Sequence, residues 1–443
     1  MSSDKLHDLF LLPELDLFKL PSITNQVEKS TRITYRPLAA LSNESPIEFY
    51  ITGSEDELIS LNKTRLYLKF NVQYKPVGTE NPKISDWKNL ELCQNALNGI
   101  FKDVEITIGD KQVSSSCSTY SYISFFHTLL NKSYCEKSTS GRAAHWFENS
   151  ASITDNISTF RSEVIRPVFT DANSKGDTEG QILEMIGSLD FDLATQPRPL
   201  PGAIPIRIKL YQHKSDFIFY TTDSDNFKPQ LVLKDAYLSV HKYKLTHIMQ
   251  SALKNALRSS PLKYPITRRE VKYFTVHSTS PSGIIDNAIV GQIPRRCFSV
   301  FIDNKNFEGS LSSSPYAFKH FNLIKMSCSV NGEQYPSRPY EFDFNSYLCM
   351  TPFQSIHDVL GIPNNFNYDY DTYKDNFPLI AFDLSPDNAP GKAKYINMPK
   401  YGTMRIEFQF KSALTSTATL LLFCEYDNII QIDNTGTVTT DYN

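Results

Sequence analysis

The chain has 443 residues, more than the roughly 250 to 300 at which a single hydrophobic core stops growing, so two domains are expected. Hydrophobic residues make up 40% and aromatic residues 12%, which is typical of a globular β protein and excludes disorder of the whole chain. The net charge of −3 argues against nucleic-acid binding by bulk electrostatics, and the pairs Arg268-Arg269 and Arg295-Arg296 are too small to change this.

Cysteine usage and the first residues indicate where the chain folds. Seven Cys, an odd number without a C-x-x-C pair, predict a reduced chain rather than a disulfide framework. Residues 6–20 are apolar but contain charges and a proline, unlike a secretory signal, and no window approaches the ~20 apolar residues of a membrane span. We therefore expect folding in the cytoplasm or nucleus and no membrane span.

Residues 1–44 are predicted to form an N-terminal extended arm, because apolar anchors alternate with prolines and no helical period develops. The anchors are Leu9, Phe10, Leu15, Leu17, Phe18 and Leu20. The arm either packs on its own domain, which is the favoured interpretation, or reaches a neighbouring subunit.

Residues 45–222 are predicted to form a first β domain, which the resemblance described below implies is a jelly roll. Apolar residues alternate with polar ones over 47–51, 66–70, 104–108 and 204–210, the pattern of half-buried antiparallel strands. Two helices are expected to interrupt the strands and to cover the ends of the barrel. One is capped by Ser85 and carries Trp87, Leu90, Ala96, Leu97 and Ile100; the other runs from Thr119 to about Leu130.

The polar, turn-rich stretch 221–229 is the best candidate for a domain boundary, and residues 223–443 are predicted to form a second β domain, for which the resemblance implies a second jelly roll. The strand 231–240 is taken as the counterpart of 66–70, and the strand and turn 328–335 as that of 106–113. The closing pair 404–410 and 417–426 is matched to 204–210 and 216–220.

This repeated order suggests two copies of one β module, although any two β domains would look similar by this criterion. A helix is expected at 246–258, and long loops at 278–287 and 364–376. The predicted fold class is all-β, with two tandem β-sandwich domains and a few short covering helices.

Motifs of enzymatic or metal chemistry are not found. The sequence has no H-x-H, H-E-x-x-H, P-loop, G-x-G-x-x-G or G-x-S-x-G pattern, and His241 and His247 are better explained as ordinary imidazoles than as ligands. Asp369 and Asp371 are spaced like EF-hand ligands, but Lys374 and Ile380 stand where Gly and Glu are needed, which favours a solvated loop.

Two other candidate groups also have simpler explanations. Asp383 and Asp387 are interpreted as turn formers rather than paired acids. Cys117, Cys135 and Cys297 lie near polar residues, but inert core cysteines are the favoured interpretation for all seven. We therefore predict no enzyme, and no catalytic, cofactor-binding or metal-binding residue.

Nine segments along the chain form a set that can be recognised together. They are 27–30 (VEKS), 45–54 (SPIEFYITGS), 119–122 (TYSY), 128–131 (TLLN), 264–270 (YPITRRE), 291–296 (GQIPRR), 316–323 (YAFKHFNL), 330–339 (VNGEQYPSRP) and 425–428 (EYDN). The set resembles the major capsid (hexon-like) proteins of Maverick/Polinton-type elements and their adintovirus relatives, nearly end to end. The chain departs from the family pattern at 132–137 (KSYCEK), which puts contacts made by that segment in doubt.

The resemblance implies two tandem jelly rolls, homotrimers that form pseudo-hexagonal capsomers, and an icosahedral shell around double-stranded DNA. Its implied partners are further copies of the chain, penton proteins and minor capsid proteins, and its implied location is the virion capsid. Sequence-specific nucleic-acid binding is not expected.

Aromatic residues between 366 and 377 are a candidate inter-subunit surface, with packing on their own domain as the alternative; they are Phe366, Tyr368, Tyr370, Tyr373 and Phe377. A penton or minor capsid protein, a lectin-like or adhesin-like double sandwich, a cupin-like enzyme and a domesticated host protein are the competing functions. Secretion and paired disulfides would favour the lectin, and a His cluster the cupin.

Overall fold

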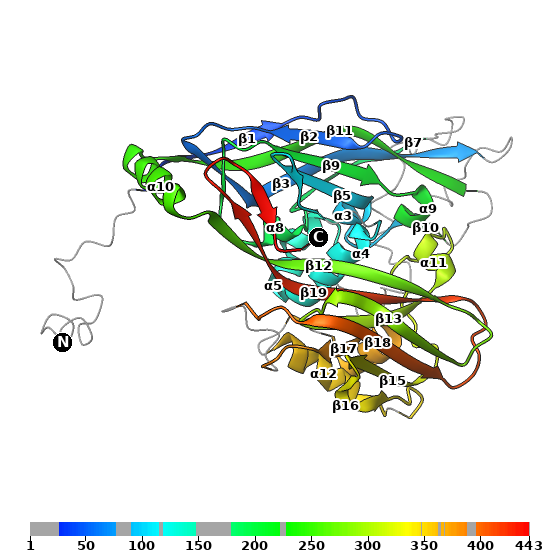
Figure 1. Cartoon of the computed structure of the whole chain (residues 1–443). Helices are drawn as coiled ribbons and strands as arrows, with labels where there is room; N and C mark the ends of the chain where they lie inside the picture. The colour runs from blue at the N-terminus through cyan, green and yellow to red at the C-terminus, as the bar shows by residue number, and fades with distance from the viewer. Residues whose placement is uncertain are drawn as a thin grey trace, which may run out of the picture.

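The computed structural model describes residues 26–76, 90–114, 118–147, 179–221, 227–346, 348–361, 365–366, 368–387 and 396–442, and they form two halves that lie one above the other in Figure 1. The strands of the upper half are β1 Val27–Tyr35, β2 Ile47–Ile51, β3 Glu57–Pro76, β4 Leu90–Leu92, β5 Phe101–Ile108, β6 Lys111–Gln112, β7 Glu179–Gly187, β8 Leu200–Pro201, β9 Ile206–Gln212, β10 Phe219–Thr221 and β11 Phe227–Leu245. Those of the lower half are β12 Leu262–Val276, β13 Ser282–Gln292, β14 Arg296–Asp303, β15 Leu323–Val330, β16 Glu333–Glu341, β17 Ile380–Asp383, β18 Tyr401–Phe410, β19 Ala418–Ile432 and β20 Val438–Thr440. The helices are α3 Ala96–Gly99, α4 Tyr120–Asn131, α5 Tyr134–Ser138, α6 Ser140–Ala143, α8 Asp192–Thr195, α9 Ser215–Ile218, α10 His247–Ser259, α11 Asn304–Glu308, α12 Met350–Leu360 and α13 Tyr370–Asn376.

Each half is a sandwich of two antiparallel sheets, and both halves use the same strand order. The upper sheets run β1-β11-β3-β7 and β2-β9-β5-β6, and the lower sheets run β12-β19-β14-β17 and β13-β18-β15-β16. Sheets that pack face to face with alternating inward residues make a β-sandwich core. The predicted all-β class with two tandem jelly rolls is confirmed.

The alternation of residue types explains which side of each strand is buried. In β2, Ile47, Phe49 and Ile51 are buried while the residues between them are half-buried or exposed. The strand β19 differs, because eleven consecutive residues from Ala418 to Asn428 are buried on both faces. It packs on the facing sheet of its own sandwich with one side and, through Phe423, on Phe126 of α4 with the other.

Two of the expected equivalences between the halves are confirmed by the sheet order. The hairpin β15–β16 occupies the place of β5–β6, and β18 occupies the place of β9. Asn331 and Gly332 form the turn of β15–β16 with φ of 53° and 88°, as a two-residue hairpin of this type requires.

The other two equivalences are wrong. The stretch 231–240 lies in β11 and pairs with 66–70 of β3 in the same sheet, so the two cannot be counterparts. The counterpart of β19 is β11, not 216–220, because β11 and β19 each lie second in their sheets. A period of two marks a strand but contains no information about its partner, which is why the order along the chain misled the comparison.

The long strand β11 also bears on where the upper half ends. It begins at Phe227 and hydrogen-bonds with β3 and β1, both of which precede residue 222. The division at 222/223 stays a prediction, as does the arm 1–44, of which residues 1–25 lie outside the described part. Within that arm, Val27–Tyr35 is a strand that pairs with Leu238–Leu245 of its own chain.

The helix expected from Ser85 to Ile100 is wrong for most of the part that the structure describes. Ser85 and Trp87 lie outside the described residues, Leu90–Leu92 is the strand β4 paired with β10, and of the described residues only Ala96–Gly99 is helical. The apolar residues of β4 that suggested a helical face are buried, and a short apolar run fits a buried strand as well as a buried helix.

The helix expected at Thr119–Leu130 is confirmed as α4, but its expected place at the end of a barrel is wrong. Eleven of its twelve residues are buried, and it lies between the two sandwiches in Figure 1. Aromatic and aliphatic side chains occur on all sides of α4, and a helix that is apolar all round is buried.

The helix expected at 246–258 is confirmed as α10, with Thr246 at its N-cap. Both long loops are partly wrong: β13 begins at Ser282, and Tyr370–Asn376 is the helix α13. Asp369 caps α13, accepting a hydrogen bond from the backbone N–H of Thr372 at 2.8 Å. A short polar helix with a cap inside a loop has too few apolar positions to be predicted from periodicity.

The packing of α4 predicts a large loss of stability on truncation of Phe125, which is 0% exposed. Phe125→Ala should lower the free energy of unfolding by about 3 to 5 kcal/mol, measured by urea denaturation, because it leaves a cavity in a close-packed core. The control is Tyr134→Ala, whose side chain is 59% exposed, with an expected change below about 0.5 kcal/mol. Equal effects of the two variants would contradict the placement of α4.

Candidate functional site at the junction of the two sandwiches

Four of the nine recognised segments meet where the sandwiches touch. TLLN ends α4, YPITRRE lies on β12, GQIPRR leads into β14, and EYDN lies on β19. β12 and β14 both pair with β19, in registers that place Arg269 and Arg296 directly opposite Glu425. Segments separated by up to about 300 residues along the chain are therefore brought together by sheet register and by the C-terminal end of α4.

Glu425 is the centre of this cluster, at 1% exposure. Its Oε2 lies 2.7 Å from Nε of Arg296 and 3.2 Å from Nη2 of Arg295, and its Oε1 lies 3.7 Å from Nε of Arg269. Burial disfavours the charged carboxylate, but the three guanidinium groups outweigh burial and hold the pKa of Glu425 well below its ordinary range. Glu425 is therefore ionised.

The cluster crosses from one sandwich to the other through Asn131, the last residue of α4. Its Nδ2 donates to Oε1 of Glu425 at 3.2 Å, and its Oδ1 accepts from Nη2 of Arg296 at 2.9 Å. Arg295 continues the cluster to Asp427, with Nη1 to Oδ1 at 2.8 Å. We call Arg269, Arg295, Arg296, Glu425 and Asn131 the junction cluster.

A second buried carboxylate, Asp190, holds the other side of α4 at 3% exposure. Nζ of Lys132 donates to both of its oxygens at 2.9 and 3.0 Å, and Oγ of Ser124 donates to Oδ2 at 2.7 Å. Burial raises the pKa of Asp190, but Lys132 and His127 lower this pKa by more than burial raises it, so the carboxylate is ionised. Lys132 begins the segment 132–137, where the chain departs from the family pattern; the segment therefore makes a contact of its own here.

His127 and Asp192 complete the electrostatics of the junction. Burial, with the nearby Arg269, lowers the pKa of His127 to about 4, so its imidazole is neutral at pH 7 although Asp190 lies 3.5 Å away. Burial raises the pKa of Asp192 to about 6, against the opposing effect of Arg269, whose backbone N–H donates to Oδ1 at 3.2 Å. The links Asp190–α4 and Asp192–β12 join both halves through one short loop.

Aromatic packing supports the same junction. Phe125 of α4 stacks on Tyr316 of the lower half with centroids 4.2 Å apart, and Phe126 stacks on Phe318 at 5.6 Å. The hydroxyl of Tyr122 donates to the carbonyl of Pro315 at 3.0 Å. Tyr316 and Phe318 belong to the recognised segment 316–323 and Tyr122 belongs to 119–122, so a fifth and a sixth segment also meet at the junction.

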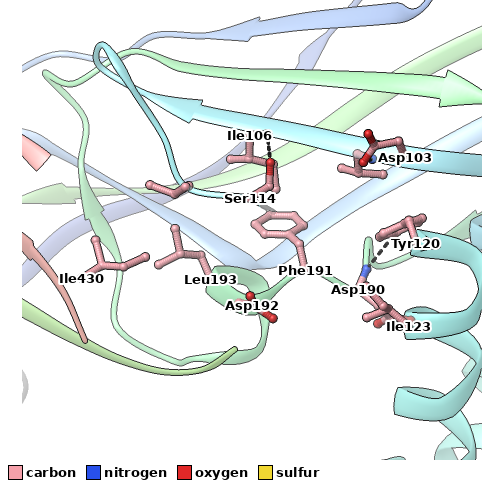
Figure 2. A pocket seen from close by; sticks show the side chains of 12 residues that line it. Asp103, Ile106, Ser114, Tyr120, Ile123, Asp190, Phe191, Asp192, Leu193 and Ile430 are labelled. Carbon is pink, nitrogen blue, oxygen red and sulfur yellow. Dashed lines mark hydrogen bonds between the residues drawn. The ribbon is translucent and has the colours of Figure 1, made fainter. Parts of the chain in front are cut away.

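A small cavity lies beside the junction, and Figure 2 shows the side chains around it. Its volume is about 40 Å³, which is enough for about one water molecule and too small for an organic ligand. Tyr120 accepts the backbone N–H of Asp190 at 3.1 Å and donates to Oδ1 of Asn98 at 2.7 Å, so its hydroxyl already has partners. The arrangement serves packing rather than ligand binding.

The structure also shows where the cysteines and the turn-forming aspartate considered from the sequence lie. Cys297 lies opposite Cys424 with sulfurs 3.5 Å apart, and the hydrogen bond between them, together with burial, raises the pKa of the Cys297 thiol. Cys135 is exposed on the short helix α5, so the expectation of a core cysteine is wrong there, and Cys117 lies outside the described residues. Asp383 accepts from the N–H and hydroxyl of Ser385 at 2.9 and 2.7 Å, which is a turn-forming contact.

The aromatic residues near α13 pack on their own domain, so their role as a candidate inter-subunit surface is wrong. Phe366, Tyr373 and Phe377 are at most 2% exposed. Tyr368 and Tyr370 are partly buried against the same core. Aromatic residues favour buried cores and interfaces alike, and composition could not distinguish the two.

Two searches were confined to the part of the chain that the structure describes. There, no three His, Cys, Asp or Glu side chains lie close enough to hold a metal ion. No helix in the same residues is long and apolar enough to span a membrane.

Sequence reasoning missed the junction cluster because it considered the arginine pairs only as a nucleic-acid surface. A signal was present: Glu425 follows the apolar run Leu420–Cys424, and a charge inside a buried strand requires a partner. The identity of that partner needed the register.

Glu425→Gln tests the cluster. Removing the carboxylate leaves three guanidinium groups without their shared partner, and we expect the free energy of unfolding to fall by about 3 to 5 kcal/mol in urea denaturation. Glu407→Gln is the matched control, because Glu407 is 48% exposed and pairs with Arg405 at the surface, where about 1 kcal/mol or less is expected. A loss at Glu425 no larger than at Glu407 would refute the role of the cluster.

His127→Asn tests the buried neutral imidazole. Its folded pKa of about 4 lies below the ordinary 6.5, so between these values the unfolded chain binds a proton that the folded chain does not. The stability of wild type relative to His127→Asn should be constant above pH 6.5 and fall by up to about 1.4 kcal/mol per pH unit from 6.5 to 4.

The measurement is urea denaturation of both chains at each pH. Asp192, whose raised pKa has the opposite effect, is present in both chains and cancels in the difference. His247→Asn, on the exposed face of α10, is the control and should follow wild type at every pH. A difference that stays constant from pH 6.5 to 4 would mean that His127 is not held neutral.

Similarity to known proteins extends over most of the chain. No family model matches the chain. An uncharacterized Caenorhabditis elegans protein is 22% identical over 403 residues, which span 89% of this chain and 93% of that protein.

Solved structures match over nearly the whole length. A chain of the Sputnik virophage aligns with a TM-score of 0.66 at 10% identity, covering 97% of this chain and 92% of that one. The mavirus major capsid protein aligns at 0.58 with 11% identity over 98% and 94%, and the Faustovirus major capsid protein at 0.59 with 9% identity over 98% and 94%. The chain therefore has the double-jelly-roll fold of the major capsid proteins of virophages and giant viruses.

Proposed function

We propose that this chain is the major capsid protein of a virus-like DNA element. Three copies form a pseudo-hexagonal capsomer, and capsomers tile an icosahedral shell around double-stranded DNA. The observation that carries the proposal is the match of both sandwiches at once, over 97% of the chain, to a chain of the Sputnik virophage. Matching one jelly roll would support any sandwich protein; matching two in fixed order supports a subunit that presents six sandwiches as a trimer.

The junction fits this function physically. Each copy in a shell has to hold its two sandwiches in one relative position, because neighbouring contacts depend on both. The junction cluster and the aromatic contacts of α4 fasten them with buried charges and stacked rings. Breaking such contacts costs several kcal/mol of free energy, on the order of 3 to 5, so the two sandwiches are expected to move as one rigid body.

The assignment to Maverick/Polinton-type elements or adintovirus relatives is part of the proposal. It rests on the nine segments, six of which meet at the junction, while VNGEQYPSRP forms the hairpin β15–β16. If members of this family assemble in the same way, each needs the residues that hold its two sandwiches in one relative position.

Exposed apolar side chains on the lower half offer a contact surface between copies. Val290 and Tyr401 are each 65% exposed and Met398 is 86% exposed. β13 is an edge strand that pairs only with β18 in its sheet. Val290 of β13 and Tyr401 of β18 lie near the end of the stretch over which the two strands pair. A solvent-facing edge with apolar side chains favours association. We call Val290, Met398 and Tyr401 the β13 edge patch.

The proposed setting follows from the function. The partners are other copies of the chain, then penton and minor capsid proteins, and the location is the virion capsid after folding in the cytoplasm or nucleus of the host. A net charge of −3 fits confinement of DNA without sequence-specific binding. No step of this function requires a catalytic residue.

A second function is a domesticated host protein that keeps the fold without building shells. The favouring observation is the nematode relative, which is similar over 93% of its own length and belongs to an animal genome. A penton or minor capsid role is disfavoured, since those commonly need one jelly roll.

Assembly mass distinguishes these functions. The full chain, expressed in a reducing host, should elute as a trimer of three 50.5 kDa subunits by light scattering, with hexagonal outlines or shells in negative-stain microscopy. A monomer at all salt concentrations and pH values would reject the capsid function and favour the domesticated protein.

The β13 edge patch has its own test. Val290→Asp with Tyr401→Asp should shift the light-scattering mass from trimer toward monomer, because charge at an apolar contact costs association energy. Tyr134→Asp, 59% exposed on α5, is the control and should remain trimeric. A trimer in both variants would place the contact elsewhere without affecting the capsid function.

A further inference from the structure

An open groove lies between α10 and the upper sandwich, distant from the junction. Its volume is about 460 Å³, within the roughly 300 to 1,000 Å³ of sites that enclose a ligand. Leu253 and Leu257 of α10 form one wall, and Leu58, Ile204 and Ile432 contribute to the other. Polar side chains lie among them, so the groove is apolar in its walls and charged in parts of its lining.

The helix α10 is unusual for its exposure. It has thirteen residues and an apolar side, yet none of its residues is buried, and Figure 1 shows it extending from one end of the molecule. A surface helix ordinarily gains its stability by burying its apolar side. The position of Leu253 and Leu257, four residues apart and only half-buried, therefore indicates that something else covers this side.

The chain itself supplies a segment that ends beside the groove. The carbonyl of Gln26, the first described residue, accepts a hydrogen bond from the backbone N–H of Thr246, the N-cap of α10, at 3.2 Å. The preceding 25 residues can span up to ~80 Å when extended, whereas α10 is only about 20 Å long. Reach is therefore no obstacle to residues 6–20 lying along α10.

Composition and charge also match. Residues 6–20 contain seven Leu and two Phe, with three acidic side chains against one Lys. The helix α10 carries Lys254 and Arg258 and no acidic residue. Lys254 pairs with Glu55 at 2.7 Å, while Arg258 has no acidic partner among the described residues. Because Glu55, Glu57 and Asp433 also line the groove, the match of the segment to the groove rests on its apolar side chains and on Arg258.

We propose that residues 6–20 of the chain's own N-terminal segment dock in the groove between α10 and the upper sandwich. The apolar anchors, among them Leu9, Phe10 and Leu15, cover Leu253 and Leu257. This inference does not depend on the proposed capsid function, since it concerns one chain.

Hydrogen–deuterium exchange of the full chain, followed by mass spectrometry, tests the docking. Peptides covering residues 6–20 should exchange at least about tenfold more slowly than the same sequence as a free peptide. Leu253→Asp with Leu257→Asp should raise their exchange to the free-peptide rate. Ile248→Asp is the matched control, because Ile248 lies on the same helix at 79% exposure and does not line the groove.

A second double variant changes residues of the N-terminal segment itself, in case the groove variant misfolds. Phe10→Asp with Leu15→Asp should speed exchange in 247–259 as well as in 6–20, while Ser3→Asp should change neither. Exchange of 6–20 at the free-peptide rate in wild type, or protection that survives both double variants, would overturn the proposal. Protection that disappears on dilution of the protein would overturn the own-chain occupant in favour of a second copy.

Discussion

The ionised carboxylate of Glu425 imposes the constraint on which the junction depends. A charge at 1% exposure is stable only if opposite charges and hydrogen-bond donors lie within contact distance, and here three arginines and Asn131 meet that need. Arg269 and Arg296 come from strands on either side of β19, so the sheet has to keep its register. Asn131 comes from α4, so the helix has to end at this point. One buried charge therefore couples the lower sheet to a helix of the upper half.

The apolar contacts around α4 and the charged ones at its end have complementary effects. Stacked rings such as Phe125 on Tyr316 bury apolar area, which stabilises association of the halves but tolerates small shifts. Charge-assisted hydrogen bonds at Glu425 and Asp190 are directional, so they define one relative position. The proposed role as a shell subunit would use both properties, because neighbouring copies would contact both sandwiches. The exposed α10 and the β13 edge patch lie outside this rigid centre, where contacts with further chain segments or copies remain open.

How much of the site could be predicted differs from residue to residue. The segments containing Arg269, Arg296 and Glu425 stand out in the sequence, and a charge after the apolar run Leu420–Cys424 already demands a partner. Which arginine pairs with Glu425 depends on the pairing of β12 and β14 with β19, and strand alternation contains no pairing information. The aromatic residues near α13 show the same limit, since Tyr373 and Phe377 suit a core or an interface equally and proved to be core.

The sequence by itself determined the all-β class, the two-module plan, the helices α4 and α10, and the hairpin turn at Asn331-Gly332, because these follow from local periodicity, capping and turn chemistry. Only the tertiary structure decided that 231–240 pairs with 66–70, that Leu90–Leu92 is a strand, and that α4 lies between the sandwiches. The physical reason is that strand partners and buried ion pairs are long-range contacts. Their energy comes from residues distant along the chain, and local pattern holds no record of which distant residues those are.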